Sequence, residues 1–251
     1  MTRASPAADC APVLIVAGPV ATLRFSRPAA HNRIDPDDLA VLSAHLETVR
    51  ADAALRLLVI TGSGRRTFSS GFTVDAIADR LDRSFEDLLD AVERFPLPTL
   101  CALNGSVYGG ATDLALCCDF RIGVRGSRMF MPAARFGLHY YPGGLRRYVT
   151  ALGAAQAKRL FMTAQAIDAD EMLRIGFLTE LVPATGLRAK IDEYANAVLA
   201  CEPSVVATMK RQIDAIAGGD AKAAAAREDY ERSLRSPLLR QRLAALRPKD
   251  G

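Results

Sequence analysis

The sequence lacks the features that mark several large classes of protein. No apolar segment among its 251 residues reaches the length of a membrane span. It has no block of like charge and no cysteine or histidine spacing typical of a zinc site. Its beginning, MTRASPAADCAP, has no continuous apolar stretch of the kind that secretion signals contain. We therefore expect no membrane, nucleic-acid or metal partner, and we expect the protein to lie in the cytoplasm.

Disulfide bonds are not expected either. The number of cysteines is odd, two of them are adjacent, and three lie in apolar runs. This arrangement favours buried free thiols, which suit a reducing compartment. The cysteines are Cys10, Cys101, Cys117, Cys118 and Cys201.

The remaining composition is typical of a globular protein that buries a sizeable core. Hydrophobic residues make up 50% of the chain and charged residues 24%, with a net charge of +4 spread along the sequence. The length suits one large domain or two small ones. There is no low-complexity tract and no long linker.

Alternating strand and helix patterns predict an α/β fold with a helical C-terminal third. Residues 13–16 and 20–25 have the pattern of two strands joined at Gly18-Pro19. Residues 56–62 predict a strand buried on both faces, and residues 84–95 predict an amphipathic helix. Further helices are predicted at residues 39–52, 111–118, 145–151, 154–160, 169–174, 186–200, 204–217 and 220–232.

The central stretch, residues 100–122, carries the most specific chemical signal. It reads LCALNGSVYGGATDLALCCDFRI, in which Gly109-Gly110 opens the predicted helix 111–118. The first N–H groups of a helix have no partner within it, and glycine lets a ligand approach them closely. Such a helix start suits an oxygen that is, or becomes, negative. Tight packing of the helix on a sheet, without a ligand, explains the glycine pair equally well.

Five ordered segments together resemble the crotonase family, also called the enoyl-CoA hydratase/isomerase superfamily. The resemblance implies a spiral of ββα repeats that forms two nearly perpendicular sheets, and helices at the C-terminus that build trimers or hexamers. It divides the chain into a frayed or disordered start at 1–11, a spiral core at 12–185 and a helical oligomerisation region at 186–251. The segments are Arg27-Pro28, VITGSGRRTFSSGF, PLPTLCALNGSVYGGATDLALCCDFRI, RMFMPAARFGLHYYPGGLRRY and GAAQAKRLFMTAQAIDADEMLRIGFLTELVP.

The resemblance also implies the chemistry of the site. In the family, two backbone N–H groups bind the carbonyl oxygen of an acyl-CoA thioester and stabilise the enolate formed from it. By position these groups belong to Phe72 and Gly110. No cofactor is expected beyond the coenzyme A that forms part of the substrate. Two fixed donors stabilise the developing charge more than they stabilise the ground-state carbonyl.

The sequence departs from the hydratases of this family at their two glutamate positions. Asp113 stands at the first and Ala133 at the second. Hydration needs an activated water and a delivered proton, which two carboxylates usually share. With one carboxylate, double-bond isomerisation is favoured over hydration, and Asp113 is the leading acid/base. Alternatively, Asp113 pairs with an arginine and serves the structure.

The segment His139-Tyr140-Tyr141 offers a second set of reactive groups. It lies where other members of the family carry reaction-specific residues, including a tyrosine in a decarboxylase. His139 can act as a base, and either tyrosine can donate a hydrogen bond or carry a proton. An acyl-CoA decarboxylase or hydrolase is therefore an alternative, and a member that binds acyl-CoA without catalysis is another. Aromatic residues of a loop also commonly just pack.

By family position, several residues meet the coenzyme A part of the substrate. The main chain near the start of the site contacts pantetheine and adenine, and basic side chains suit the phosphates. The predicted contacts are Arg27, Ala29, Ser70, Thr73, Val74, Asp75 and Lys210.

Overall fold

The computed structural model describes residues 10–245, which form two compact units. One unit ends at Ala200 and the other begins at Cys201. The predicted frayed start at 1–11 falls mostly outside the described residues, but Cys10 and Ala11 belong to the first strand. None of the described helices is both long enough and apolar enough to cross a bilayer.

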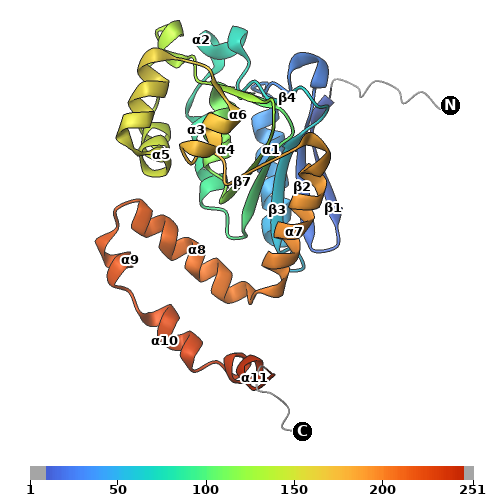
Figure 1. Ribbon diagram of the computed structural model, residues 1–251, viewed down its shortest axis with the longest axis vertical. Coiled ribbons are helices and arrows are strands. Elements are labelled where there is room, and N and C mark those ends of the chain that lie inside the picture. The colour runs from blue at the N-terminus through green and yellow to red at the C-terminus, as the bar shows by residue number, and fades with distance from the viewer. Residues whose placement is uncertain (1–9, 246–251) are drawn as a thin grey trace, which may run out of the picture. The chain divides into compact units, whose positions relative to one another are not determined.

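A six-stranded sheet forms the centre of the first unit (Figure 1). Its first two strands make the predicted antiparallel hairpin, and the strands from the second onward run parallel. In spatial order the strands are β1 (Cys10–Ala17), β2 (Val20–Ser26), β3 (Leu57–Gly62), β5 (Thr99–Leu103), β7 (Phe120–Val124) and β10 (Glu180–Val182).

A second, four-stranded sheet is built from the strands that follow those of the first. Its order is β4 (Thr67–Ser69), β6 (Ser106–Tyr108), β8 (Arg128–Phe130) and β9 (Ile167–Asp168). Along the chain, β3 leads to β4, β5 to β6 and β7 to β8, and each pair is followed by helical structure. The chain therefore repeats a ββα unit, as the resemblance implied.

Helices cover both faces of the large sheet. Successive side chains of a strand point to opposite sides, so a strand of this sheet can bury all of them. Leu58 and Ile60 of β3 pack in the main core with α1 (Asp38–Ala51), α3 (Arg83–Glu93) and α4 (Gly110–Leu116). Leu57 and Val59 pack on the other face against α7 (Leu187–Ala200). The strand is thus buried on both faces, as its continuous apolar run predicts.

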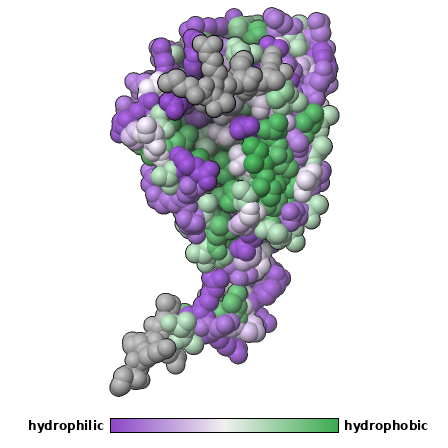
Figure 2. Space-filling model, turned by 90° about the vertical axis from the view of Figure 1, so that its right-hand side faces the viewer, coloured by the Kyte–Doolittle hydropathy of each residue, from purple (hydrophilic) through white to green (hydrophobic). Residues whose placement is uncertain are grey.

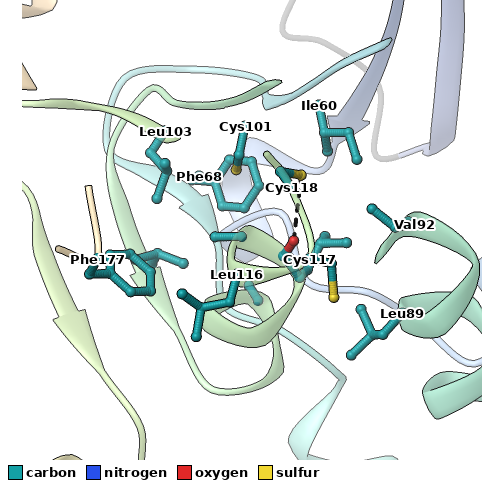
Figure 3. Packing of buried hydrophobic residues seen from close by; sticks show 14 of the residues in the cluster. Ile60, Phe68, Leu89, Val92, Cys101, Leu103, Leu116, Cys117, Cys118 and Phe177 are labelled. Atoms are coloured by element: carbon teal, nitrogen blue, oxygen red, sulfur yellow. Dashed lines mark hydrogen bonds between the residues drawn. The ribbon is translucent and has the colours of Figure 1, made fainter. Parts of the chain in front are cut away.

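The central cysteines are part of this core. Cys101, Cys117 and Cys118 are buried free thiols (Figure 3). Cys10 and Cys201 are free and exposed. The Cys118 thiol donates a hydrogen bond to the Leu114 carbonyl oxygen at 3.6 Å. Burial raises the pKa of Cys117 well above its ordinary value, so this thiol stays protonated. The prediction of free, buried thiols in the apolar runs is confirmed.

One helix prediction agrees with the structure in where the chain bends, and one does not. The helices expected at 145–151 and 154–160 both lie in α5 (Pro142–Thr163), which is interrupted at Gly153, where a φ of 78° and a ψ of 156° are not helical. The helix expected at 220–232 is wrong: α9 (Ala221–Ala225) and α10 (Glu228–Leu234) are separated at Ala226, which is extended. The remaining helical elements are η1 (Pro28–Ala30), η2 (Val74–Ala76), α2 (Ile77–Arg80), η3 (Ala133–Phe136), α6 (Ala169–Arg174), η4 (Ala184–Gly186), α8 (Pro203–Ala217) and α11 (Pro237–Ala245).

Apolar side chains also remain on the surface. Figure 2 shows a continuous apolar area on the face turned toward the viewer. In the second unit, Met209, Ile213 and Ile216 of α8 are 59%, 63% and 47% exposed, and their spacing puts them on one side of the helix. Such a stripe is typical of a helix that packs against another chain. The predicted oligomerisation by this region stays a prediction.

Candidate functional site

The first unit contains a cavity of about 460 Å³ with largely apolar walls. The walls come from three parts of the chain, namely residues of 70–86, of 108–110 and of 130–141. These are the segments that follow β4, β6 and β8, so the ββα repeat itself brings them together. Among the predicted site residues, those that line the cavity are Ser70, Phe72, Val74, Gly110, His139, Tyr140 and Tyr141.

The Phe72 and Gly110 amides lie close together in the cavity wall. A Cβ placed on Gly110 would lie 3.8 Å from the Phe72 nitrogen, and one on Gly71 would lie 2.6 Å from the Gly110 nitrogen. The Ile34 amide donates to the Gly71 carbonyl oxygen at 2.8 Å, and the Thr73 amide donates to the Ile34 carbonyl oxygen at 3.0 Å. These two hydrogen bonds lie on either side of Phe72 and leave its amide out. Within residues 10–245, neither the Phe72 nor the Gly110 amide donates to a protein acceptor. Both N–H groups are therefore available to a ligand oxygen.

Close packing explains why this arrangement needs glycine. Gly71 has a φ of +80°, and a Cβ there would come within 2.9 Å of backbone atoms on three residues, including the Gly110 nitrogen. The ring of Phe85, from α3, covers Gly110, since a Cβ at Gly110 would lie 2.7 Å from its tip. The same ring packs edge-to-face on Phe72 with centroids 5.5 Å apart. Phe85 thus holds α3 against both amide-bearing loops.

Asp113 does not line this cavity, because it lies behind the two tyrosines. Its side chain is 0% exposed and is held by Arg147, with Nε to Oδ1 at 2.9 Å and Nη2 to Oδ2 at 3.1 Å. The Tyr140 hydroxyl donates to Oδ2 at 3.3 Å, and the Tyr141 hydroxyl donates to the same oxygen. Both carboxylate oxygens are therefore occupied. The structure favours the second interpretation of Asp113, that of an aspartate paired with an arginine.

Arg147 ties Asp113 to helix α3. Its side chain is 2% exposed, and Nη1 donates to Asp90 at 3.0 Å and to Glu93 at 2.9 Å. Burial alone lowers the pKa of Arg147, but the hydrogen bonds from its guanidinium to Asp113 outweigh that effect and raise it. The guanidinium is thus a fixed charge that joins α3, α4 and α5.

The two tyrosines face the cavity as protonated groups. Burial, together with the negative charge of Asp113, raises the pKa of both Tyr140 and Tyr141 above the ordinary value. Their rings stack 4.5 Å apart at a tilt of 31°. His139 beside them is exposed and lines the same cavity. The predicted cluster is thus placed together, with neutral hydroxyls rather than phenolates.

Sequence reasoning missed an acidic residue of the cavity wall, Glu86 on α3. It is half-buried, and within residues 10–245 it has no hydrogen-bond or ion-pair partner. The amphipathic pattern of this helix predicts only its buried apolar face, which begins with Phe85. No local pattern in the sequence marks Glu86, because only the packing of α3 brings it to the cavity.

The predicted coenzyme A contacts are only partly at the cavity. Ser70 and Val74 line it, whereas Thr73 and Asp75 belong to the same segment but do not. Within the first unit, Arg27 and Ala29 lie outside these walls: Arg27 pairs with Asp35 and Asp38, and Ala29 is exposed in η1. Lys210 belongs to the second unit, where it pairs with Asp214. Among the described residues, no cluster of three or more His, Cys, Asp or Glu side chains is able to hold a metal ion.

Comparisons with known proteins agree with this architecture. The sequence profile of the enoyl-CoA hydratase/isomerase family matches residues 16–237. The chain is 33% identical over 190 residues to a crotonyl-CoA hydratase of Syntrophomonas wolfei, covering 72% of each chain. It is 30% identical over 204 residues to a short-chain-enoyl-CoA hydratase of Clostridium acetobutylicum, covering 78% of each.

Solved structures show the same fold. The structure of DspI from Pseudomonas aeruginosa superposes with a TM-score of 0.80 and 27% identity, covering 93% of this chain and 90% of that one. An enoyl-CoA hydratase from Bacillus anthracis superposes with a TM-score of 0.83 at 23% identity, covering 93% and 95%. From its sequence, its fold and its relatives, the chain belongs to the enoyl-CoA hydratase/isomerase, or crotonase, family.

Proposed function

We propose that the protein is an enzyme that acts on an acyl-CoA thioester through an enolate held by the Phe72 and Gly110 amides. The observation that carries this proposal is a pair of N–H groups, side by side in the wall of an apolar cavity, that donate to no acceptor in the described part of the chain. Removing a proton next to the thioester places negative charge on its carbonyl oxygen. Two fixed donors in a site poor in water stabilise that charge, and losing one typically costs roughly 10²–10³-fold in rate.

We further propose that the reaction is double-bond isomerisation rather than hydration. The relatives from Syntrophomonas wolfei and Clostridium acetobutylicum are called hydratases, and the family's hydratases use two glutamates. Here one of these positions is Ala133, a buried residue of the cavity wall, and the other, Asp113, is sealed against Arg147. Isomerisation needs only one group that removes a proton and returns it, whereas hydration also needs an activated water.

Asp113 acts in this proposal as a positioning residue. Its carboxylate accepts hydrogen bonds from both tyrosine hydroxyls, which fixes the orientation of the two hydroxyl groups beside the cavity. Arg147 holds the carboxylate in place through two parallel hydrogen bonds. The acid/base role that the sequence suggested for Asp113 would require this group to leave a buried ion pair.

A decarboxylase is the second candidate, because His139, Tyr140 and Tyr141 all line the cavity. Loss of carbon dioxide from a 2-carboxyacyl-CoA leaves its electron pair on the same carbon, so the product is the same enolate. In this candidate a tyrosine hydroxyl turns from Asp113, to which it donates in the structure, and donates to the substrate carboxylate instead. Hydrolysis of the thioester would use the same residues.

Several further properties belong to the proposal. The reaction needs no cofactor beyond the coenzyme A of the substrate, which the predicted residues Ser70 and Val74 contact from the cavity wall. The exposed stripe on α8 supports assembly into a homotrimer or homohexamer. The free thiols of the core support a place in the cytoplasm.

The proposal is tested by incubating the protein in heavy water with crotonyl-, 3-enoyl-, dienoyl- and methylmalonyl-CoA and following the products by mass spectrometry. Conversion of the 3-enoyl thioester, with deuterium at the α or γ carbon, is the expected result. Release of carbon dioxide from methylmalonyl-CoA would favour the second candidate. Tight binding in calorimetry with no product from any substrate would show a non-catalytic acyl-CoA-binding member.

A further inference from the structure

An enolate mechanism needs a group in the cavity that can take a proton from carbon. Neither position implied by the family resemblance supplies one here, because Ala133 has no acid and both oxygens of Asp113 are occupied. Two other carboxylates line the cavity, Asp82 and Glu86. Asp82 caps helix α3, where it accepts hydrogen bonds from the amide and the hydroxyl of Ser84, and it is fully exposed.

Glu86 differs from Asp82 in that it does not cap the helix. It is half-buried in the cavity wall, and no residue of 10–245 pairs with it. It belongs to a row of acids on one side of α3, since residues four and seven positions apart share a helix face. The other two members, Asp90 and Glu93, hold Arg147. The helix therefore uses two acids to fix the network behind the tyrosines and presents the third, one turn earlier, to the cavity.

The first turn of α3 is also fixed against the proposed oxyanion site. Phe85, next to Glu86, covers Gly110 and packs edge-to-face on Phe72. A substrate whose carbonyl oxygen is held by the Phe72 and Gly110 amides occupies the cavity that Glu86 also lines. Tyr140 and Tyr141 belong to the walls of the same cavity.

We propose that Glu86 is the catalytic acid/base of this protein, supplied by α3 in place of the missing family carboxylate. This inference rests on the proposed function. The Glu86 carboxylate removes a proton from the α carbon of a 3-enoyl thioester, and the electrons of the broken C–H bond form the enolate. The resulting carboxyl group gives its proton to the γ carbon. The double bond then lies between the α and β carbons, and neither water nor a co-reactant is consumed.

The variant Glu86→Gln tests this assignment, and Asp87→Asn is its matched control. Asp87 is an exposed acid on the same helix that does not line the cavity. General acid–base groups contribute roughly 10²–10⁴-fold. We expect Glu86→Gln to lower kcat for 3-enoyl-CoA by about that factor while KM changes less than about threefold, and Asp87→Asn to leave both unchanged. Glu86→Asp, which keeps a carboxylate, should restore part of the activity.

Binding of butyryl-CoA, a saturated probe, separates catalysis from structure. Calorimetry should give the same affinity for Glu86→Gln and for the parent protein. Turnover of Glu86→Gln within about threefold of the parent would overturn the assignment, and so would an equal loss of butyryl-CoA binding. If the parent protein neither isomerises 3-enoyl-CoA nor exchanges its α protons, the proposed function fails and this inference fails with it. A failure of Glu86 alone leaves the parent protein active.

Discussion

Replacing Asp113 by asparagine tests whether the buried network behind the tyrosines is structural. The substitution keeps the shape of the side chain but removes the charge that Arg147 faces at 2.9 Å and 3.1 Å. Breaking a buried ion pair typically costs about 3–5 kcal/mol. Arg147 keeps Asp90 and Glu93 as partners, so we expect the lower end, about 3 kcal/mol. In a unit of this size, that loss lowers the melting temperature by roughly 6–12 °C.

The assay is denaturant unfolding of the full chain, with Asp170→Asn as the control. Asp170 pairs with Arg125 at 3.1 Å, but their side chains are 78% and 61% exposed, so this loss should stay below about 1 kcal/mol. A double-mutant cycle with Arg147→Met should show strong coupling to Asp113→Asn, because the two residues share one interaction. A loss below about 1 kcal/mol for Asp113→Asn, or additivity in the cycle, would refute the structural role.

Two further predictions follow from the geometry of the site. Gly71→Ala should lower activity roughly 10²–10³-fold, because its Cβ would press on the Gly110 amide. The control is Gly126→Ala, because Gly126 has a similar φ of +82° but open space around it. The activity of this variant should stay near that of the parent protein. Equal losses of activity in the two variants would contradict this explanation. Tyr140 and Tyr141 should ionise only as the chain unfolds in alkali. Their ionisation is measured by absorbance at 295 nm. Their folded pKa values lie above the unfolded value of about 10, so the folded state binds more protons and loses stability as pH rises past that value; ionisation near pH 10 without unfolding would contradict it.

Much of the fold could be predicted from local patterns. The β1–β2 hairpin follows from two strand patterns around a turn dipeptide, and the continuous apolar run of β3 indicates burial on both faces. Breaks within helical segments were predictable where a glycine marks them. The interruption of α5 at Gly153 lies between the helices expected at 145–151 and 154–160, whereas the extended Ala226, which separates α9 from α10, has no such signal.

The site was only partly predictable because its partners are distant in sequence. The cavity residues Phe72, Gly110 and the 139–141 cluster could be found from motifs that carry their own local signal. The arginine that holds Asp113 lies 34 residues away, on a different helix, and several other arginines were possible partners. Glu86 carried no motif at all, since only the packing of α3 on the two loops brings it to the cavity.

The most direct test of the account is the exchange of substrate α protons for deuterium in heavy water. A 3-enoyl-CoA thioester is incubated with the parent protein and with Gly71→Ala, and its mass is followed over time. Stabilisation of an enolate by the Phe72 and Gly110 amides predicts deuterium uptake and double-bond migration by the parent protein, both strongly slowed in Gly71→Ala. Binding of the thioester by the parent protein without any deuterium uptake or product would contradict the account.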